Sequence, residues 1–292
     1  MSGSSWPPSK KEVGGFKLTT PKTSVKQVIM LTLGWEELPK AWSIHGIDQK
    51  ERLVEPVPAL LIETIDGWVL LDTGFNKALI EDGALFDRFH SKFHQILPIL
   101  PAYSTDPLLD ALDRHGLSVD QLLAVGVSHL HNDHAGGLRH FGASGTPVFI
   151  QSKELEFGLG DIVKAQSHGL ARVDYDDPRL NYRQISGDVE IAPGIRAIST
   201  PGHTPGHQSF MVDFPQSNSA NGFIFAFDAG DLIENFESEL PIGGFIDVEA
   251  QDTLEQILKL KSLAEQNQMV IVPGHDPTIW PTTEEGLFRI IS

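Results

Sequence analysis

Ten consecutive residues carry the strongest structural signal in this chain: Ser128-His129-Leu130-His131-Asn132-Asp133-His134-Ala135-Gly136-Gly137. An apolar run over 122–127 precedes them and predicts a buried strand. Alternate residues of an extended segment share one face, so His129 and His131 can reach the same metal ion. If a helix begins at the turn that follows, Asp133 and His134 project from its start toward a second ion. The stretch therefore predicts part of a dinuclear metal centre at the end of a strand.

An ordinary structural role is the alternative, because a single histidine more often packs, caps or lies on a surface than binds metal. Four ligand-type side chains within six residues favour metal binding. A zinc-like ion needs four or more donors, so further ligands must come from elsewhere in the chain. The chain contains no cysteine, and these ligands must therefore be imidazoles and carboxylates.

Three other apolar runs end in candidate ligands. His203 lies in Thr200-Pro201-Gly202-His203-Thr204-Pro205-Gly206-His207 after a predicted strand over 195–200, Asp228 ends the run over 223–227, and His275 follows a predicted strand over 269–272. His207 lies four residues beyond His203 and could compete with it for the same ion. Each of the three strands thus delivers one candidate ligand.

The remaining sequence alternates strand and helix patterns. We predict a β-hairpin over 57–73 with its turn at Asp66-Gly67, strands over 147–150 and 208–214, a hairpin loop over 215–222, and helices over 106–115 and 249–266. The segment over 84–103 is expected to be an irregular flap or a short helix with a loop. Residues 1–24 lack hydrophobic periodicity and are expected to form a weakly ordered arm or a surface strap, which leaves 25–292 as a single domain.

Composition limits the partners of the protein. The chain has 292 residues, with 22 Lys and Arg against 39 Asp and Glu, and a formal net charge of −17. An acidic surface repels phosphate backbones and anionic lipid headgroups, so we expect no nucleic-acid or membrane partner. The sequence has no run long enough to span a membrane and no secretory signal pattern, which predicts a cytoplasmic protein.

The whole pattern resembles the metallo-β-lactamase superfamily, over about Val57 to Trp280. The resemblance implies an α+β fold, the αββα sandwich, in which two sheets pack face to face with helices outside. It implies one metal ion on His129, His131 and His203, a second on Asp133, His134 and His275, and Asp228 as the bridge between them. Two zinc ions per chain are expected, although manganese, iron or cobalt also suit these ligands. A hydroxide between the ions is the expected nucleophile, because two cations lower the pKa of a shared water.

The resemblance gives two further residues supporting roles. His207 is expected to lie behind the metal ligands. Asp72, in the turn Asp72-Thr73-Gly74, resembles a buried carboxylate of the family that accepts a hydrogen bond from a ligand imidazole and fixes its tautomer. An Asx-type turn is the alternative role for Asp72.

Finer motifs are similar to the N-acyl homoserine lactonases of this superfamily. The shared stretches are 128–137, 200–209, 234–245 and 95–98. This similarity implies a small-molecule cyclic ester as the substrate. One position departs from the pattern, because those lactonases have a tyrosine facing the substrate carbonyl where this chain has Asp231. An ionised carboxylate would repel a developing oxyanion there.

Asp231 consequently has two interpretations. If burial and a neighbouring carboxylate keep it protonated, Asp231 could donate a proton to a leaving nitrogen. Lactams and cyclic carbamates such as benzoxazolinones have such a leaving group. The chain also resembles fungal metallo-γ-lactamases that open these rings. Otherwise Asp231 faces solvent or caps the turn before Glu234. Asp133 and Asp231 are the candidate catalytic carboxylates. A metal-binding protein without turnover is a rival function, against which the full ligand set argues.

Two aromatic-rich segments predict an apolar substrate pocket. Its candidate lining residues are Phe86, Phe89, Phe93, Ile96, Leu97, Trp35 and Trp42. The same residues could belong to the core or to the contact face of a homodimer. The other histidines of the chain, His168 among them, are interpreted as surface or partly packed residues.

Overall fold

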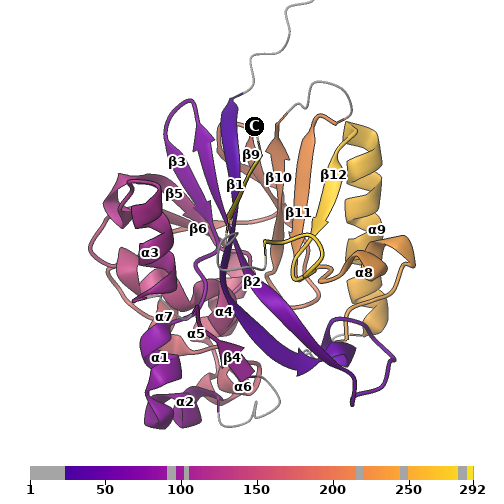
Figure 1. The fold of residues 1–292 in the computed structure, drawn as a ribbon, viewed down its shortest axis with the longest axis horizontal. Coiled ribbons are helices and arrows are strands. Elements are labelled where there is room, and N and C mark those ends of the chain that lie inside the picture. The colour runs from indigo at the N-terminus through magenta and orange to yellow at the C-terminus, as the bar shows by residue number, and fades with distance from the viewer. Residues whose placement is uncertain are drawn as a thin grey trace, which may run out of the picture.

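The computed structural model describes residues 24–90, 97–101, 105–214, 220–243, 249–281 and 288–291. Two β-sheets pack face to face in the middle of the molecule, with helices on both outer sides (Figure 1). The predicted αββα sandwich is confirmed. The predicted arm, apart from Ser24, and the predicted pocket residues Phe93 and Ile96 lie outside the described residues.

The first sheet has the strand order β13-β1-β2-β3-β5-β6-β7, and β4 also pairs with β1. Its strands are β1 (Val25–Pro39), β2 (Arg52–Thr64), β3 (Trp68–Leu71), β4 (Leu97–Ile99), β5 (Leu122–Gly126), β6 (Pro147–Gln151), β7 (Asn181–Ile185) and β13 (Phe288–Ile291). Strands β3, β5, β6 and β7 run parallel, whereas β1, β2 and β3 form an antiparallel meander. Because parallel strands end at one edge of a sheet, the turn after β3 meets the histidine-rich stretch after β5.

The second sheet has the strand order β12-β11-β10-β9-β8. Its strands are β8 (Val189–Ala192), β9 (Ile195–Ser199), β10 (Gln208–Asp213), β11 (Gly222–Phe227) and β12 (Val270–Pro273). The register pairs Ser199 with Gln208 and Phe227 with Pro273. The segments that carry His203, Asp228 and His275 therefore leave this sheet at the same edge.

Helices cover the outer faces of both sheets. They are α1 (Lys77–Glu81), α2 (Gly83–His90), α3 (Pro107–Arg114), α4 (Asn132–Ala135), α5 (Ser152–Leu159), α6 (Ile162–Ser167), α7 (Arg172–Tyr175), α8 (Ile233–Glu237) and α9 (Ala250–Asn267), with 3-10 turns η1 (Lys40–Trp42), η2 (Val119–Gln121) and η3 (Gly136–Phe141). In Figure 1, α3 lies beside the first sheet and α9 beside the second. Among the described residues, no helix combines the length and the apolar character needed to cross a membrane.

Both faces of the central strands are buried, and their side chains alternate between two cores. In β1, Ile29 and Leu31 pack under the helices of the first layer, whereas Val28 and Met30 pack between the sheets. This alternation is the reason why such strands show as continuous apolar runs in the sequence. A third core joins α9 to the outer face of the second sheet.

Most predicted elements are confirmed within the described residues. The hairpin over 57–73 corresponds to β2 and β3, and Gly67 has the positive φ, +146°, that its turn requires. The segment over 84–103 contains α2 and β4. Strand β1 was not predicted, although it has 15 residues and residues 28–33 form an apolar run broken only by Thr32.

Candidate metal centre and active site

The seven predicted metal ligands converge where β5, β9, β11 and β12 end. One group contains His129, His131, His203 and Asp228, and a second contains Asp133, His134 and His275. Within each group, one nitrogen or oxygen of every side chain lies within 4.8 Å of those of the others. All seven residues are buried, with at most 6% exposure. Tertiary structure thus places the predicted ligands in the two sets that the sequence analysis assigned to two ions, with Asp228 in the first.

The first group has the donor set of a metal site. Nδ1 of His131 lies 2.9 Å from Nε2 of His129 and 2.8 Å from Nε2 of His203. Burial lowers the pKa of all three histidines, that of His131 to about 4. Neutral imidazoles keep a lone pair for a metal ion, so three buried ring nitrogens facing one point fit a cation.

Asp228 links the two groups through its two carboxylate oxygens. Oδ2 lies 3.2 Å from Nε2 of His203, whereas Oδ1 lies 3.1 Å from Nε2 of His134 and 3.0 Å from Nε2 of His275. Burial alone would raise the pKa of Asp228, but the surrounding histidines, His134 above all, hold it well below its ordinary value. An ionised carboxylate with one oxygen toward each group is suited to bridge two cations.

The second group is assembled at the start of α4. This helix begins at Asn132, with His131 as its N-cap, and it places Oδ2 of Asp133 2.7 Å from Nε2 of His134. Gly136 follows α4 and packs against the turn after β3, where an added Cβ would lie 2.2 Å from the backbone nitrogen of Asn76. Glycine is required at this close approach, which sets the distance between the ligand stretch and β3.

Asp72 holds the histidine of that group from behind. Its Oδ2 accepts hydrogen bonds from Nδ1 of His134 at 2.7 Å and from the Ser128 hydroxyl at 2.6 Å, while Oδ1 accepts one from the Ser128 backbone at 2.6 Å. Asp72 also has a left-handed backbone, with φ +60°. The turn conformation and the contact with a ligand imidazole thus occur together. Nδ1 of His275 is held similarly, by donating to the Pro56 carbonyl at 2.9 Å.

His207 lies in neither ligand group. Its Nδ1 is 2.9 Å from the Thr200 hydroxyl and 3.2 Å from the Thr200 carbonyl, and its ring centre is 5.2 Å from that of His129. His207 thus lies beside His129 and outside both ligand groups, and its supporting role stays a prediction.

Glu154 joins the two ligand-bearing loops, a role that the sequence analysis did not foresee. It accepts hydrogen bonds from the backbone of Leu130 at 3.0 Å, the hydroxyl of Thr204 at 2.6 Å and the backbone of Gly206 at 3.0 Å. The loop that carries His203 is therefore fastened to the stretch that carries His129 and His131. No local pattern marks Glu154, because its partners are distant in sequence.

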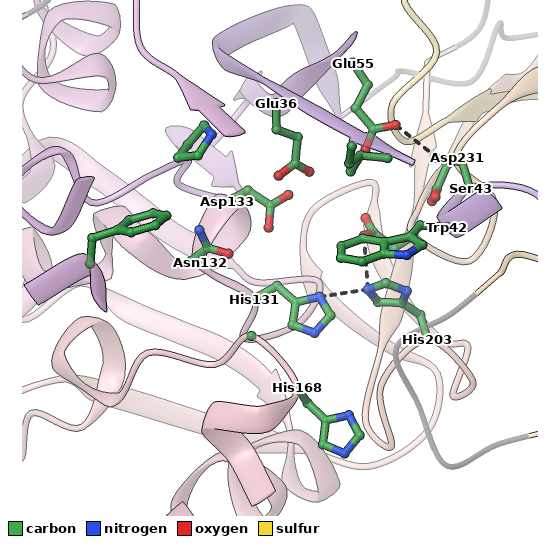
Figure 2. A pocket seen from close by; sticks show the side chains of 15 residues that line it. Glu36, Trp42, Ser43, Glu55, His131, Asn132, Asp133, His168, His203 and Asp231 are labelled. Atoms are coloured by element: carbon green, nitrogen blue, oxygen red, sulfur yellow. Dashed lines mark hydrogen bonds and ion pairs between the residues drawn. The ribbon is translucent and has the colours of Figure 1, made fainter. Parts of the chain in front are cut away.

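A pocket opens over both groups (Figure 2). The residues that line it are Glu36, Leu38, Trp42, Ser43, Glu55, Phe86, Pro98, His131, Asn132, Asp133, His168, Gly169, His203, Asp228 and Asp231. The predicted lining residues Trp42 and Phe86 are among them. His168, interpreted from the sequence as an ordinary surface or partly packed residue, also faces the pocket.

Trp35 and Leu97 were wrongly predicted to line this pocket. Successive side chains of a strand point to opposite faces, and the neighbours Glu36 and Pro98 face the pocket. Trp35 and Leu97 therefore point away, and Leu97 is 52% exposed. The side chain of Phe89 lies outside the described residues.

Asp231 lies in the pocket beside Asp228. It is 6% exposed, and its Oδ1 has no hydrogen-bond partner in the described chain. The interpretation that it faces solvent is therefore wrong, and α8 is instead capped at Leu232, whose backbone nitrogen donates to Asn235. Burial, followed by the charge of Asp228, raises the pKa of Asp231 well above its ordinary value.

Two more buried carboxylates, Glu36 and Glu55, line the pocket and were missed in the sequence. Burial raises the pKa of both, that of Glu55 to about 7. Glu55 directly precedes the apolar run of β2, and a single acidic residue there was the available signal. Glu36 had none, because β1 itself was not recognised.

The fold and the ligand set define a metal-binding αββα sandwich. Residues 52–275 match the family model of the Metallo-beta-lactamase superfamily, and the chain belongs to this superfamily. It is 36% identical over 221 residues to an N-acyl homoserine lactonase of Bacillus thuringiensis, which covers 76% of this chain and 81% of that protein. It is 33% identical over 185 residues to the lactonase AttM of Agrobacterium fabrum, covering 58% of this chain and 67% of that protein.

The solved structures agree with these relatives. An N-acyl homoserine lactone hydrolase with the product N-hexanoyl-L-homoserine at its catalytic metal centre superposes with a TM-score of 0.75 and 32% identity. The match covers 88% of this chain and 95% of that one.

Proposed function

We propose that this protein is a dinuclear zinc hydrolase that opens a small cyclic ester. The observation that carries the proposal is the pair of ligand groups, shared through Asp228, at the floor of the pocket. Lactonase relatives at 36% identity support an ester substrate. Imidazole and carboxylate ligands suit zinc, and also manganese, iron or cobalt.

The ligand residues hold the reactive centre in a defined geometry. When bound, two ions there would supply a water of lowered pKa and would polarise a carbonyl oxygen of the substrate. Asp72 keeps Nε2 of His134 directed at the centre, and the Pro56 carbonyl does the same for His275. The loops carrying these ligands are held by Glu154 and by the close packing of Gly136. The chain thus orients its ligands before a substrate binds.

The pocket walls position the ring and limit access of water. Trp42 and Phe86 offer apolar surface, whereas Asn132 and His168 offer polar atoms on the same lining. An ester ring placed between them has its carbonyl directed to the ligand groups on the pocket floor. We propose that Asp133 and Asp231 are the catalytic carboxylates of this reaction.

A cyclic amide or carbamate is the second candidate substrate, and Asp231 is the observation that favours it. A nitrogen leaving group needs a proton, and a buried Asp231 with a raised pKa keeps one available beside Asp228. We infer that Asp231, in its protonated form, donates this proton to the leaving nitrogen.

A side-by-side assay tests the proposal. The zinc-loaded protein is given an acyl-homoserine lactone, a simple γ-lactone and a benzoxazolinone, and ring opening is followed for each. Turnover of the lactones supports the ester proposal, and turnover of the carbamate with little lactone activity supports the second candidate. Failure on all three rings by a protein that holds two ions would favour the metal-binding protein without turnover.

We also propose that the protein acts in the cytoplasm, on a small molecule and without nucleic-acid or membrane partners. The net charge of −17 supports the expectation of no nucleic-acid or membrane partner. A homodimer stays a prediction, which light scattering of the purified protein tests.

A further inference from the structure

The loop between β9 and β10 carries His203 at its tip. Pairing of Ser199 with Gln208 holds the two ends of this loop in the second sheet, and the Gln208 backbone also donates to the Ser128 carbonyl at 2.9 Å. The tip, residues 201–206, extends beyond these contacts. The position of His203 relative to the other ligands of the first group therefore depends on what holds the tip.

Glu154, in the first turn of α5, holds this tip. Its Oε2 accepts hydrogen bonds from the Thr204 hydroxyl at 2.6 Å and from the Gly206 backbone at 3.0 Å, and its Oε1 accepts one from the Leu130 backbone at 3.0 Å. Within the described part of the chain, and with His203 excepted, the tip makes no other hydrogen bond to a residue outside its own loop. One carboxylate thus joins the tip to the ligand-bearing stretch after β5.

Close packing fixes the same contact. An added Cβ at Gly206 would lie 2.1 Å from the backbone nitrogen of Glu154, and an added Cβ at Gly158 would lie 2.6 Å from the side chain of Leu130. Both glycines therefore let α5 approach the two ligand-bearing segments more closely than a residue with a Cβ permits. The distance between α5 and these segments is thus set by packing as well as by hydrogen bonds.

A carboxylate suits this position and an amide does not. Two of the three donors are backbone N–H groups, which cannot accept, and they reach different oxygens of Glu154. A carboxylate accepts at both oxygens, whereas the amide of glutamine has one acceptor oxygen and an NH2 group that only donates. A glutamine here would therefore direct a donor at the backbone N–H of Leu130 or of Gly206.

The protein provides no positive charge to balance Glu154. The residue is fully buried, its three partners are neutral, and among the described residues no Lys, Arg or His forms an ion pair with it. Burial raises the pKa of Glu154 to about 7. Its partners Leu130 and Thr204 are sequence neighbours of the three histidines of the first group, which share one carboxylate, Asp228, with the second. A divalent ion in the first group is the positive charge that Glu154 lacks.

We propose that Glu154 is a positioning residue for the first ion. Its carboxylate holds His203 against His129 and His131 before an ion binds, and its negative charge stabilises the ion through the protein interior. The proposal rests on the proposed function in one respect, namely that the first ligand group binds a cation. It adds that the two ions depend on different carboxylates outside the ligand groups, the first on Glu154 and the second on Asp72.

Zinc binding to Glu154→Gln tests the proposal. Competition with a chelating dye should show a dissociation constant about 10- to 100-fold higher for one of the two ions and an unchanged constant for the other. A His203→Ala background, which should lack the first ion, identifies the ion affected, because Glu154→Gln should not change the remaining constant there. Glu156→Gln is the matched control, since Glu156 is exposed on the same helix.

Amide hydrogen exchange of the metal-free protein gives a readout that does not depend on ions. Exchange at Leu130 and Gly206, whose N–H groups donate to the carboxylate, should become about 10-fold faster or more in Glu154→Gln. Exchange at Phe210, in the core strand β10, should not change, and Glu156→Gln should affect none of these amides.

Variants of Thr204 keep the test available if Glu154→Gln does not fold. Thr204→Val removes one of the three donors to Glu154 and should raise the dissociation constant of the first ion about 5-fold. Thr204→Ser keeps the hydroxyl and should leave both constants unchanged.

Two unchanged dissociation constants in a folded Glu154→Gln protein would overturn the proposal, and so would an equal loss of affinity for both ions. Exchange that becomes equally faster at Phe210 would also contradict it, because Glu154 would then only stabilise the fold. If the protein binds two ions and opens none of the proposed rings, the proposed function fails, whereas a loss confined to the first ion still supports the role of Glu154.

Discussion

Replacing Asp72 with asparagine should weaken the binding of one metal ion and leave the binding of the other unchanged. Oδ2 of Asp72 accepts a hydrogen bond from Nδ1 of His134 at 2.7 Å, which leaves Nε2 of His134 as a lone pair facing Asp228. An asparagine amide directed at His134 donates instead of accepting. The proton of the imidazole then moves to Nε2, the atom that would bind the ion.

The expected magnitude is a 10- to 100-fold loss of metal affinity, or about 1.4 to 2.7 kcal/mol, as for other residues that orient a ligand imidazole. Backbone strain does not contribute, because Asn tolerates the left-handed conformation that Asp72 adopts at φ +60°. Affinity should fall for the ion that Asp133, His134 and His275 would hold. The ion on His129, His131 and His203 has no ligand in contact with Asp72 and should remain.

Competition with a chelating dye measures both dissociation constants. Asp66→Asn is the matched control, because Asp66 is an exposed residue at the turn of the adjoining β2–β3 hairpin. Two unchanged dissociation constants in a folded Asp72→Asn protein would refute the argument. An equal loss of affinity for both ions would also contradict it, because the loss would then not be explained by the hydrogen bond to His134.

Three further predictions concern other residues. His203→Ala should remove one of two ions and most of the activity, whereas His207→Ala should keep both ions by elemental analysis, since His207 belongs to neither ligand group. Asp231→Tyr should raise lactone opening and abolish any carbamate opening, because a phenol stabilises an oxyanion but the acid that protonates nitrogen is lost. Burial raises the pKa of Asp174 from 3.8 to about 8, because the native state binds this proton more tightly than the unfolded chain does. As the pH rises from about 4 to about 8, the free energy of unfolding should therefore decrease by about 1.4 kcal/mol per pH unit. Urea unfolding should show that Asp174→Asn removes this slope, and that Asp176→Asn at the exposed position nearby does not.

The positions of the candidate ligands were predictable because each follows an apolar run. Strand periodicity places His129 and His131 on one face, and the same buried strands make the runs before His203, Asp228 and His275 visible. The chemistry of the ligands was equally readable, since a chain without cysteine has only imidazoles and carboxylates for a zinc-like ion. These are local properties, and a sequence expresses them directly.

The wall of the pocket depended on contacts between distant residues. Glu36 meets Glu55 only through the register of β1 on β2, and a shift within β1 changes which face each residue takes. The same shift turned Trp35 away from the pocket, while Trp42, on the turn after β1, entered it. Local sequence therefore determined which groups can bind metal, and long-range strand pairing alone decided which carboxylates stand beside them.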